Sequence, residues 1–243
     1  MKVKTDLLSI KGLAQTFLMT DIKTTPFSPV IVTHPFTDTG FIYFKGDSKP
    51  KNLLENKDTL LRWHNEVKKQ ISESNSADRI FLLLTKPYRL VFLKYAEPYL
   101  TQKDFSRILA DVWIQTEAPH NDPNFSTSKL TSLFRKADPV YLMETDEYEQ
   151  FKELENTVTV YRGVTSYSKD NLKGLSWTLN PETAEWFANR FYEDGTVYEA
   201  QIDKAHIYAY FSRRNESEVI VDPKYLTGIT EYEYETNEFT QTM

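Results

Sequence analysis

The hydrophobic pattern of this 243-residue chain changes its period near residue 145. Before that point apolar side chains recur at roughly helical spacing, as they do in Leu53–Ser72. After it they alternate, as they do in Thr157–Val164, which places every second side chain on one face of a strand. The sequence therefore predicts an α+β fold in which a mainly helical front precedes a strand-rich back.

The front, residues 1–150, is expected to form an N-terminal region with a short β-hairpin and then helices. Residues 28–33 and 40–44 have the pattern of two strands around a turn. The acidic run Glu144–Glu155 is interpreted as the solvated face of a helix. Apolar spacing and proline punctuation predict helices at residues 53–72, 88–100, 104–116 and 128–137.

The back, residues 151–243, is expected to form a separate strand-rich core. Within it, Asn180 reads as an N-cap and Pro181 as the first helical residue, so we expect a helix at residues 182–191. Its apolar stripe is Ala184, Phe187, Ala188 and Phe191. Strands are expected at residues 157–164, 175–178, 196–202, 207–211, 218–221 and 227–234.

Composition excludes several classes of protein. A formal net charge of −6 argues against broad binding to duplex DNA, and the lack of cysteine excludes disulfides and thiolate metal sites. We see no signal peptide and no membrane-spanning run, so we expect a cytoplasmic protein with no membrane partner. Only seven glycines are present and none forms a phosphate-binding loop, so side chains must hold the phosphates of any bound nucleotide.

Three polar signatures follow one another in the back of the chain. Arg162 ends an alternating run, and its planar fork of donors suits a phosphate. Ser176 and Thr178 alternate around Trp177, so both hydroxyl groups can face a cleft while the indole packs behind them. Taken singly, each signature is also typical of an ordinary surface turn or strand.

A pair of glutamates completes this set. Glu216 and Glu218 stand at the entrance to the apolar strand Val219–Val221, and they would share a face if that strand extended to Glu216. Taken alone, two carboxylates at the edge of a strand are more often simply solvated. In order, the series is an arginine, a Ser-x-Thr and a Glu-x-Glu.

This series resembles that of the ADP-ribosyltransferases of the Arg, Ser-x-Thr, Glu-x-Glu class, including their phage and bacterial members. The resemblance covers residues 156–235, and the spacings of 14 residues from Arg162 to Ser176 and 42 from Ser176 to Glu218 agree in scale. It implies a core of two packed, mostly antiparallel sheets. It also implies an NAD-dependent enzyme that transfers ADP-ribose to an acceptor and releases nicotinamide.

The resemblance assigns roles to individual residues. By it, Arg162 contacts the NAD phosphates, Gly163 holds the nicotinamide amide through its backbone, and Ser176 braces the catalytic glutamate. Glu218 bonds the nicotinamide ribose and stabilises the developing cation. Glu216 orients or deprotonates the acceptor. Trp177 and Thr178 complete the expected cofactor-binding strand.

Two further positions follow from the helix after the serine signature. By the same resemblance Phe187 covers the nicotinamide and Arg190 contacts a phosphate, although Phe187 lies in the apolar stripe and equally fits a core position. The chain departs from the family pattern at Arg213, where arginine-modifying members usually carry an aromatic residue. It departs again at residues 164–167, where some members carry a glutamine.

Protein arginine is the favoured acceptor, because the first residue of the pair is glutamate rather than glutamine. Two alternatives stay open for the same site: an NAD glycohydrolase, in which water is the acceptor, and an enzyme that modifies RNA. An inactive fold that serves as a binding module is the alternative of another class. The four histidines show no ligand spacing, so no metal is expected. A phage or bacterial effector would act in the cytoplasm of the infected or targeted cell.

Overall fold

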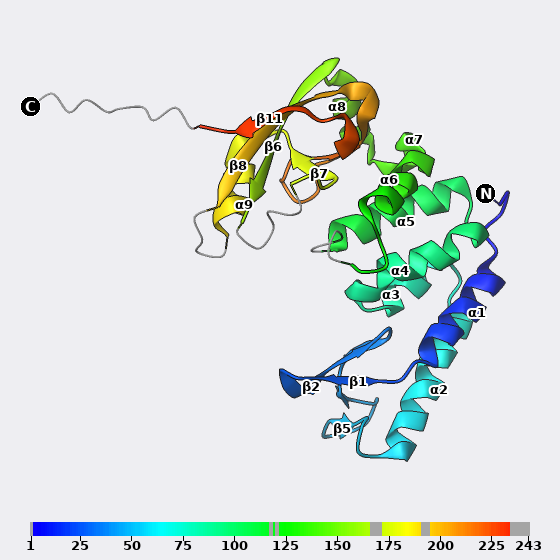
Figure 1. The fold of residues 1–243 in the computed structure, drawn as a ribbon. Helices are drawn as coiled ribbons and strands as arrows, with labels where there is room; N and C mark the ends of the chain where they lie inside the picture. The colour runs from blue at the N-terminus through cyan, green and yellow to red at the C-terminus, as the bar shows by residue number, and fades with distance from the viewer. Residues whose placement is uncertain (1, 117–118, 120–121, 166–171, 191–194, 234–243) are drawn as a thin grey trace, which may run out of the picture. The chain divides into compact units, whose positions relative to one another are not determined.

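The computed structural model describes residues 2–116, 119, 122–165, 172–190 and 195–233 (Figure 1). Within these ranges the chain is a mixture of helices and antiparallel strands, as an α+β fold requires. The sequence-based prediction of the fold class is confirmed at this level. The expected ends of two elements, Phe191 and Tyr234, lie outside the described residues, as does His120.

Two compact units make up the chain: a first unit, Met1–Pro119, and a second unit, His120–Met243. The sequence places the boundary at residue 150 instead, because the period of the hydrophobic pattern changes there. The helices at residues 127–153 pack against strand Ile207–Phe211 of the second unit, although their sequence pattern resembles that of the front. Periodicity identifies these helices without indicating which core they join.

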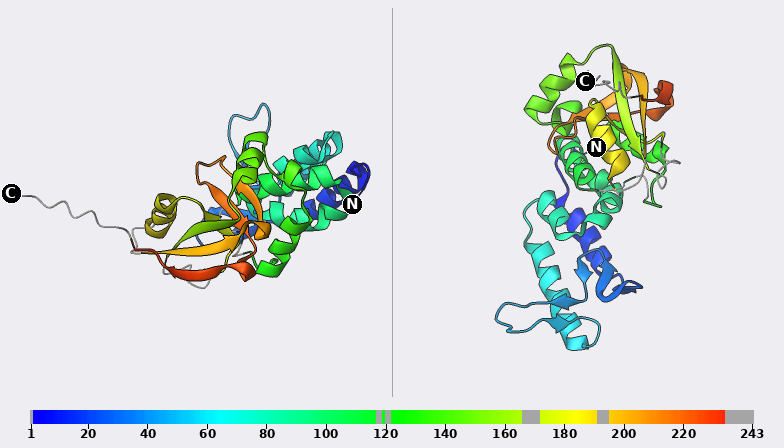
Figure 2. Two further views of the ribbon diagram at one scale, coloured as in Figure 1. Left: turned by 90° about the horizontal axis from the view of Figure 1, so that it is seen from above. Right: turned by 90° about the vertical axis from the view of Figure 1, so that its left-hand side faces the viewer.

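The helices of the first unit begin at polar caps. Asn56 accepts hydrogen bonds from two amides at the start of the second helix, and Thr101 accepts one from the amide of Asp104 at the start of the fifth. The first and second helices lie side by side (Figures 1 and 2). The described helices are α1 (Leu7–Leu18), α2 (Lys57–Glu73), α3 (Ala77–Leu83), α4 (Lys86–Ala96), η1 (Glu97–Tyr99) and α5 (Gln102–Gln115).

Short strands join α1 to α2. A three-stranded sheet has the order β1-β2-β3, and a two-stranded sheet pairs β4 with β5. The expected pairing of residues 28–33 with 40–44 is wrong, because β2 forms its hairpin with β3, whereas β4 lies in the smaller sheet and pairs with β5. The strands are β1 (Lys23–Thr25), β2 (Ser28–His34), β3 (Thr37–Thr39), β4 (Phe41–Ile42) and β5 (Lys51–Asn52).

The second unit is built on one sheet, whose strand order is β11-β8-β6-β7-β10-β9 and whose described pairs are all antiparallel. This differs from the expected core of two packed sheets. The strands are β6 (Thr157–Val164), β7 (Ser176–Thr178), β8 (Thr196–Asp203), β9 (Ile207–Phe211), β10 (Glu218–Val221) and β11 (Thr227–Glu231). Five of these match predicted strands to within one residue, and β11 begins where expected.

Helices cover this sheet at two places. The ninth helix contacts β6, β7 and β8, whereas the sixth, seventh and eighth contact β9. Ala184 and Ala188 of the ninth helix pack on Val197 in a small buried cluster. The helices are α6 (Thr127–Lys136), α7 (Pro139–Leu142), α8 (Thr145–Glu153) and α9 (Pro181–Asn189), with the short turns η4 (Lys204–His206) and η5 (Pro223–Tyr225).

The acidic run at residues 144–155 is only partly a solvated helix face. It forms α8, as expected, but Glu147 within it has an exposed fraction of 0%. Glu144 and Glu147 form a capping box at the start of the helix, so the pattern identifies the helix end correctly. The interpretation of the whole run as solvated is wrong at this one residue.

Candidate functional site

The candidate site lies where two neighbouring strands of the sheet separate. Strand β6 pairs with β8 along its whole length, but with β7 at a single position, Tyr161 opposite Thr178. Beyond that pair the guanidinium of Arg162 reaches across the gap and donates from Nη1 to the main-chain carbonyl of Ser176. A side chain therefore takes the place of the next backbone pairing between the two strands.

The Arg162 guanidinium is enclosed and incompletely paired. Its Nε is buried and has no hydrogen-bond partner among the described residues, although the residue as a whole is half-buried. Burial lowers the pKa of Arg162 to about 10, against the opposing effect of the negative charge of Glu218. At neutral pH the group is still a cation, and one of its donors lacks an acceptor. An anionic oxygen would supply what this buried cation lacks.

Ser176 and Glu218 meet diagonally across the pairing of β7 with β10, in which Glu218 lies opposite Thr178 and Ser176 opposite Ile220. The hydroxyl Oγ of Ser176 donates to Oε1 of Glu218 at 2.6 Å. These residues lie 42 positions apart in the sequence, and the antiparallel register brings them together. A short hydrogen bond to a carboxylate holds it in one orientation. The structure thus contains a hydrogen bond from Ser176 to Glu218, whereas the catalytic role of this glutamate stays a prediction.

The other residues of the Ser-x-Thr strand divide between its two faces, as alternation predicts. Thr178 donates from Oγ1 to the main-chain carbonyl of Glu216 at 2.6 Å. Trp177 has an exposed fraction of 2%, and its indole Nε1 donates to the carbonyl of Gly174 at 3.1 Å. Trp177 therefore packs in the core, and its side chain offers nothing to a ligand, contrary to its place in the predicted cofactor-binding set.

The first glutamate of the pair is not on a strand. Strand β10 begins at Glu218, and Glu216 belongs to the preceding loop. The intervening Ser217 has φ 45°, and Asn215 has φ 57°, so both residues are in the left-handed region that non-glycine residues seldom adopt. The condition for a shared strand face, a strand that extends to Glu216, is not met, because the left-handed Ser217 interrupts the alternation before it reaches Glu216. Such strained backbone is typical of functional loops.

The loop before β10 is anchored to α8 by the buried Glu147. Its Oε1 accepts hydrogen bonds from the amide of Ser212 at 2.9 Å and from Nε of Arg213 at 3.2 Å. Its Oε2 accepts from the amide of Glu144 at 2.9 Å. Sequence reasoning missed this residue, since only the capping-box spacing marks it and that spacing says nothing about the partner loop. Arg213, at the position of the family's aromatic residue, is directed to this anchor.

The neighbouring arginine makes a different contact. Arg214 approaches Oε1 of Glu216 with Nη2 at 2.7 Å and with Nε at 3.0 Å. The Arg214 side chain is 43% exposed and that of Glu216 is 20% exposed. Two adjacent arginines of one loop thus bind two different carboxylates, one buried beneath the loop and one beside Glu218.

Gly163 has a packing role that the sequence does not reveal. A Cβ atom at this position would overlap the carbonyl oxygen of Ala184 and lie 2.5 Å from the amide nitrogen of Ala188. Glycine is therefore required so that α9 can approach β6 closely. The space beside the Cα is filled by the helix, so it is not the ligand approach expected at that point. The role of the Gly163 backbone toward nicotinamide stays a prediction.

Phe187 lies in the last turn of α9, and Arg190 is the residue that caps the end of this helix. Phe187 is half-buried and Arg190 is exposed, with its guanidinium carbon 5.7 Å from the centroid of the Phe187 ring. Trp186, which sequence reasoning overlooked, is 61% exposed and packs edge-on against Phe187 with ring centroids 4.9 Å apart. An exposed tryptophan beside a cation and a second ring makes a surface that can stack on a flat ligand.

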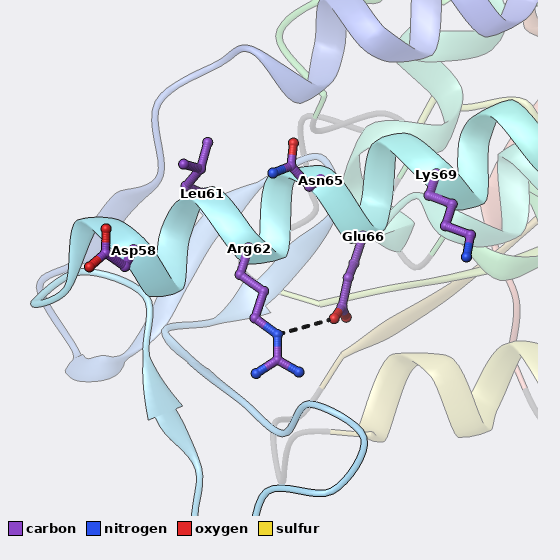
Figure 3. A pocket seen from close by; sticks show the side chains of 6 residues that line it. All are labelled: Asp58, Leu61, Arg62, Asn65, Glu66 and Lys69. Atoms are coloured by element: carbon purple, nitrogen blue, oxygen red, sulfur yellow. Dashed lines mark ion pairs between the residues drawn. The ribbon is translucent and has the colours of Figure 1, made fainter.

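Two hollows of the first unit contain none of these residues. One runs along α2 with a volume of about 400 Å³ and is lined by Asp58, Leu61, Arg62, Asn65, Glu66 and Lys69 (Figure 3). In it Arg62 pairs with Glu66 at 3.4 Å and lies over the ring of Phe44. The other lies between α1 and α2, with a volume of about 670 Å³. Arg62 and Glu66 of the first hollow are thus engaged with their neighbours.

In the part of the chain that the structure describes, no group of three or more histidine, aspartate or glutamate side chains is placed to hold a metal ion. Among the helices in this described part, none has the length and apolar character needed to cross a bilayer.

Comparison with protein-family models, with curated proteins and with solved structures finds no match to this chain. The case for a function therefore rests on the residues of the site and their geometry.

Proposed function

We propose that the second unit binds NAD and transfers its ADP-ribose group to an acceptor, with release of nicotinamide. The observation that carries this proposal is the convergence of Arg162, Ser176 and Glu218 where β6 and β7 separate. Protein arginine is the favoured acceptor, and RNA is the alternative macromolecule. NAD contains a glycosidic bond between its ribose and nicotinamide, and nicotinamide is a good leaving group.

Arg162 would bind a phosphate of NAD. Its enclosed guanidinium has an unpartnered Nε, and burial has already removed most of the water that would compete with an anion. A pyrophosphate oxygen at this position would accept that hydrogen bond and offset the cost of the buried charge. The expectation that Arg162 binds an anion therefore follows from its burial and its unpartnered Nε, without use of the resemblance to the ADP-ribosyltransferases.

Glu218 would stabilise the positive charge that develops on the ribose as the glycosidic bond breaks. Its carboxylate is oriented by Ser176 before any ligand arrives, so little reorganisation is needed at the moment of reaction. A fixed carboxylate beside an oxocarbenium-like transition state is the arrangement that glycosidases use. Glu216, in the loop beside it, would accept a proton from the acceptor.

Nicotinamide release from NAD by the purified protein tests the proposal. Glu218→Gln keeps the size of the side chain and removes its charge, so the rate should fall by about 10²–10³. Glu231→Gln is the matched control, because this carboxylate is exposed on β11 and should leave the rate unchanged. Equal rates in the two variants would contradict the role of Glu218, and no release by the wild-type protein would contradict the function.

The acceptor is identified in a second experiment. The protein is incubated with NAD labelled in its adenosine part and with a cell lysate, and labelled molecules are located by mass spectrometry. Label on arginine side chains of proteins is the expected result. Label on RNA would identify the alternative acceptor, whereas nicotinamide release with only free ADP-ribose would identify an NAD glycohydrolase.

A further inference from the structure

The chain places an arginine of its own against the proposed acceptor glutamate. Both Nε and Nη2 of Arg214 contact the same oxygen, Oε1 of Glu216, at 3.0 and 2.7 Å. An acceptor arginine that gave up a proton to Glu216 would have to bring a guanidinium nitrogen to hydrogen-bond distance from this carboxylate. Arg214 already meets that requirement.

The loop is fixed so that this pair stays beside the catalytic carboxylate. Thr178 holds the carbonyl of Glu216 at 2.6 Å, and the amide of Leu179 donates to the carbonyl of Ser217 at 3.0 Å. Ser176 on the same strand holds Glu218. Three hydrogen bonds to β7 and the turn that follows it therefore keep the two glutamates in a constant relation to each other.

We infer that Arg214 is a site of self-modification, at which the protein attaches ADP-ribose to its own guanidinium group. This inference rests on the proposed function and adds an acceptor to it. An exposed ion pair of this kind holds its partners only weakly, so the Arg214 side chain is able to swing between Glu216 and the reacting ribose. Its 43% exposure also leaves room for the bulky product.

The step balances in atoms and charge. Glu216 takes one proton from the guanidinium, and a terminal nitrogen of Arg214 then forms a bond to C1′ of the nicotinamide ribose. The bond between C1′ and the nicotinamide ring nitrogen breaks, and its electron pair leaves with neutral nicotinamide. The proton passes from Glu216 to solvent, so one proton is released for each group transferred.

Arg213 supplies an internal contrast. It is adjacent in sequence, but it bonds to Glu147, which has an exposed fraction of 0%, and it also donates to the carbonyl of Leu142. A guanidinium tied to a buried carboxylate on α8 is not presented at Glu216. The two neighbouring arginines have identical chemistry and differ only in the carboxylate that each contacts. Self-modification is therefore expected at Arg214 and not at Arg213.

The purified full chain is incubated with NAD and no other acceptor, nicotinamide release is recorded, and the modified residue is located by electron-transfer mass spectrometry. We expect ADP-ribose on Arg214, and loss of this label in Arg214→Lys while nicotinamide is still released. A mixture of wild-type protein with Glu218→Gln protein tests whether the transfer is internal, the Glu218→Gln chain being marked with a heavy isotope so that the two chains can be told apart. ADP-ribose on the wild-type chain alone is the expected result.

Three outcomes overturn the inference. Nicotinamide release with no label on Arg214 would refute self-modification at this residue and leave the proposed function standing. Label on Arg213 in place of Arg214 would refute the geometric distinction. Absence of both nicotinamide release and label would refute the proposed function and the inference together.

Discussion

Replacing Arg162 by methionine should make the second unit more stable and should abolish tight binding of NAD. The reason is that the folded protein encloses a cation that it does not fully pair. Nη1 donates to the Ser176 carbonyl, but Nε has no partner in the described structure, and burial lowers the pKa of Arg162 from its ordinary value to about 10. Methionine has a similar stem and no charge, so it removes that cost.

The magnitude follows from the pKa. One unit corresponds to about 1.4 kcal/mol, so the lowered pKa sets a ceiling of about 3 kcal/mol on the gain. The attraction of Glu218 is already contained in that pKa, and loss of the hydrogen bond to Ser176 subtracts a further amount of about 1–2 kcal/mol. A net gain of about 1–2 kcal/mol in the free energy of unfolding is expected. At pH 7 the cost is fully present, and it disappears only as the pH rises through about 10 towards the ordinary pKa of arginine.

Urea unfolding at pH 7 measures the stability, and calorimetry with NAD measures binding, which should weaken by about 1.5–3 kcal/mol. Arg135→Met is the control with the opposite sign. The hydrogen bonds and charges of Tyr208 and the buried Asp222 raise the pKa of Arg135, so its loss should destabilise the same unit. A destabilised Arg162→Met protein with unchanged affinity for NAD would refute the reasoning and leave Arg162 as a structural residue.

Three further variants test the glutamates and the serine of the site. Glu216→Gln should leave nicotinamide release largely intact and abolish labelling of arginine. The reason is that a guanidinium with a pKa above about 12 needs a base to become nucleophilic. Nicotinamide release and arginine labelling are assayed in parallel, and loss of both would contradict this prediction. Glu147→Ala should lower the free energy of unfolding by about 3–5 kcal/mol, since it leaves Arg213 without its buried partner, and urea titration checks this value. Ser176→Ala should reduce kcat more than NAD affinity, because it frees Glu218 to rotate; steady-state kinetics would contradict this if only KM changed.

The local elements of the second unit can be predicted from the sequence because each is determined by its own residues. The alternation of Thr157–Val164 gives β6 its exact bounds, and the Asn180 cap with Pro181 gives the start of α9. Helix α1 was not predicted, although Ile10, Ala14 and Leu18 are buried along one stripe at helical spacing.

The tertiary features of the site could not be predicted in the same way. The parting of β6 from β7 depends on which strands become neighbours, and the inward direction of Arg213 depends on a buried residue 66 positions earlier. Gly163 shows the same limit, because its missing side chain is required by the approach of a helix that follows it in the sequence. Residue type and spacing give candidates, whereas their partners are fixed by packing.

The unfavourable features of the second unit lie at the candidate site and not at random. An under-paired buried cation at Arg162 and a left-handed, non-glycine Ser217 both lower stability, and both adjoin Glu218 in space or in sequence. A sheet optimised only for stability would close the gap between β6 and β7 with backbone hydrogen bonds and would place an apolar side chain where Arg162 lies. Retention of these costs beside a carboxylate that is already oriented is the pattern of a preorganised binding site. The Arg162→Met variant separates the two explanations, because only a functional site predicts that stability rises while affinity for NAD falls.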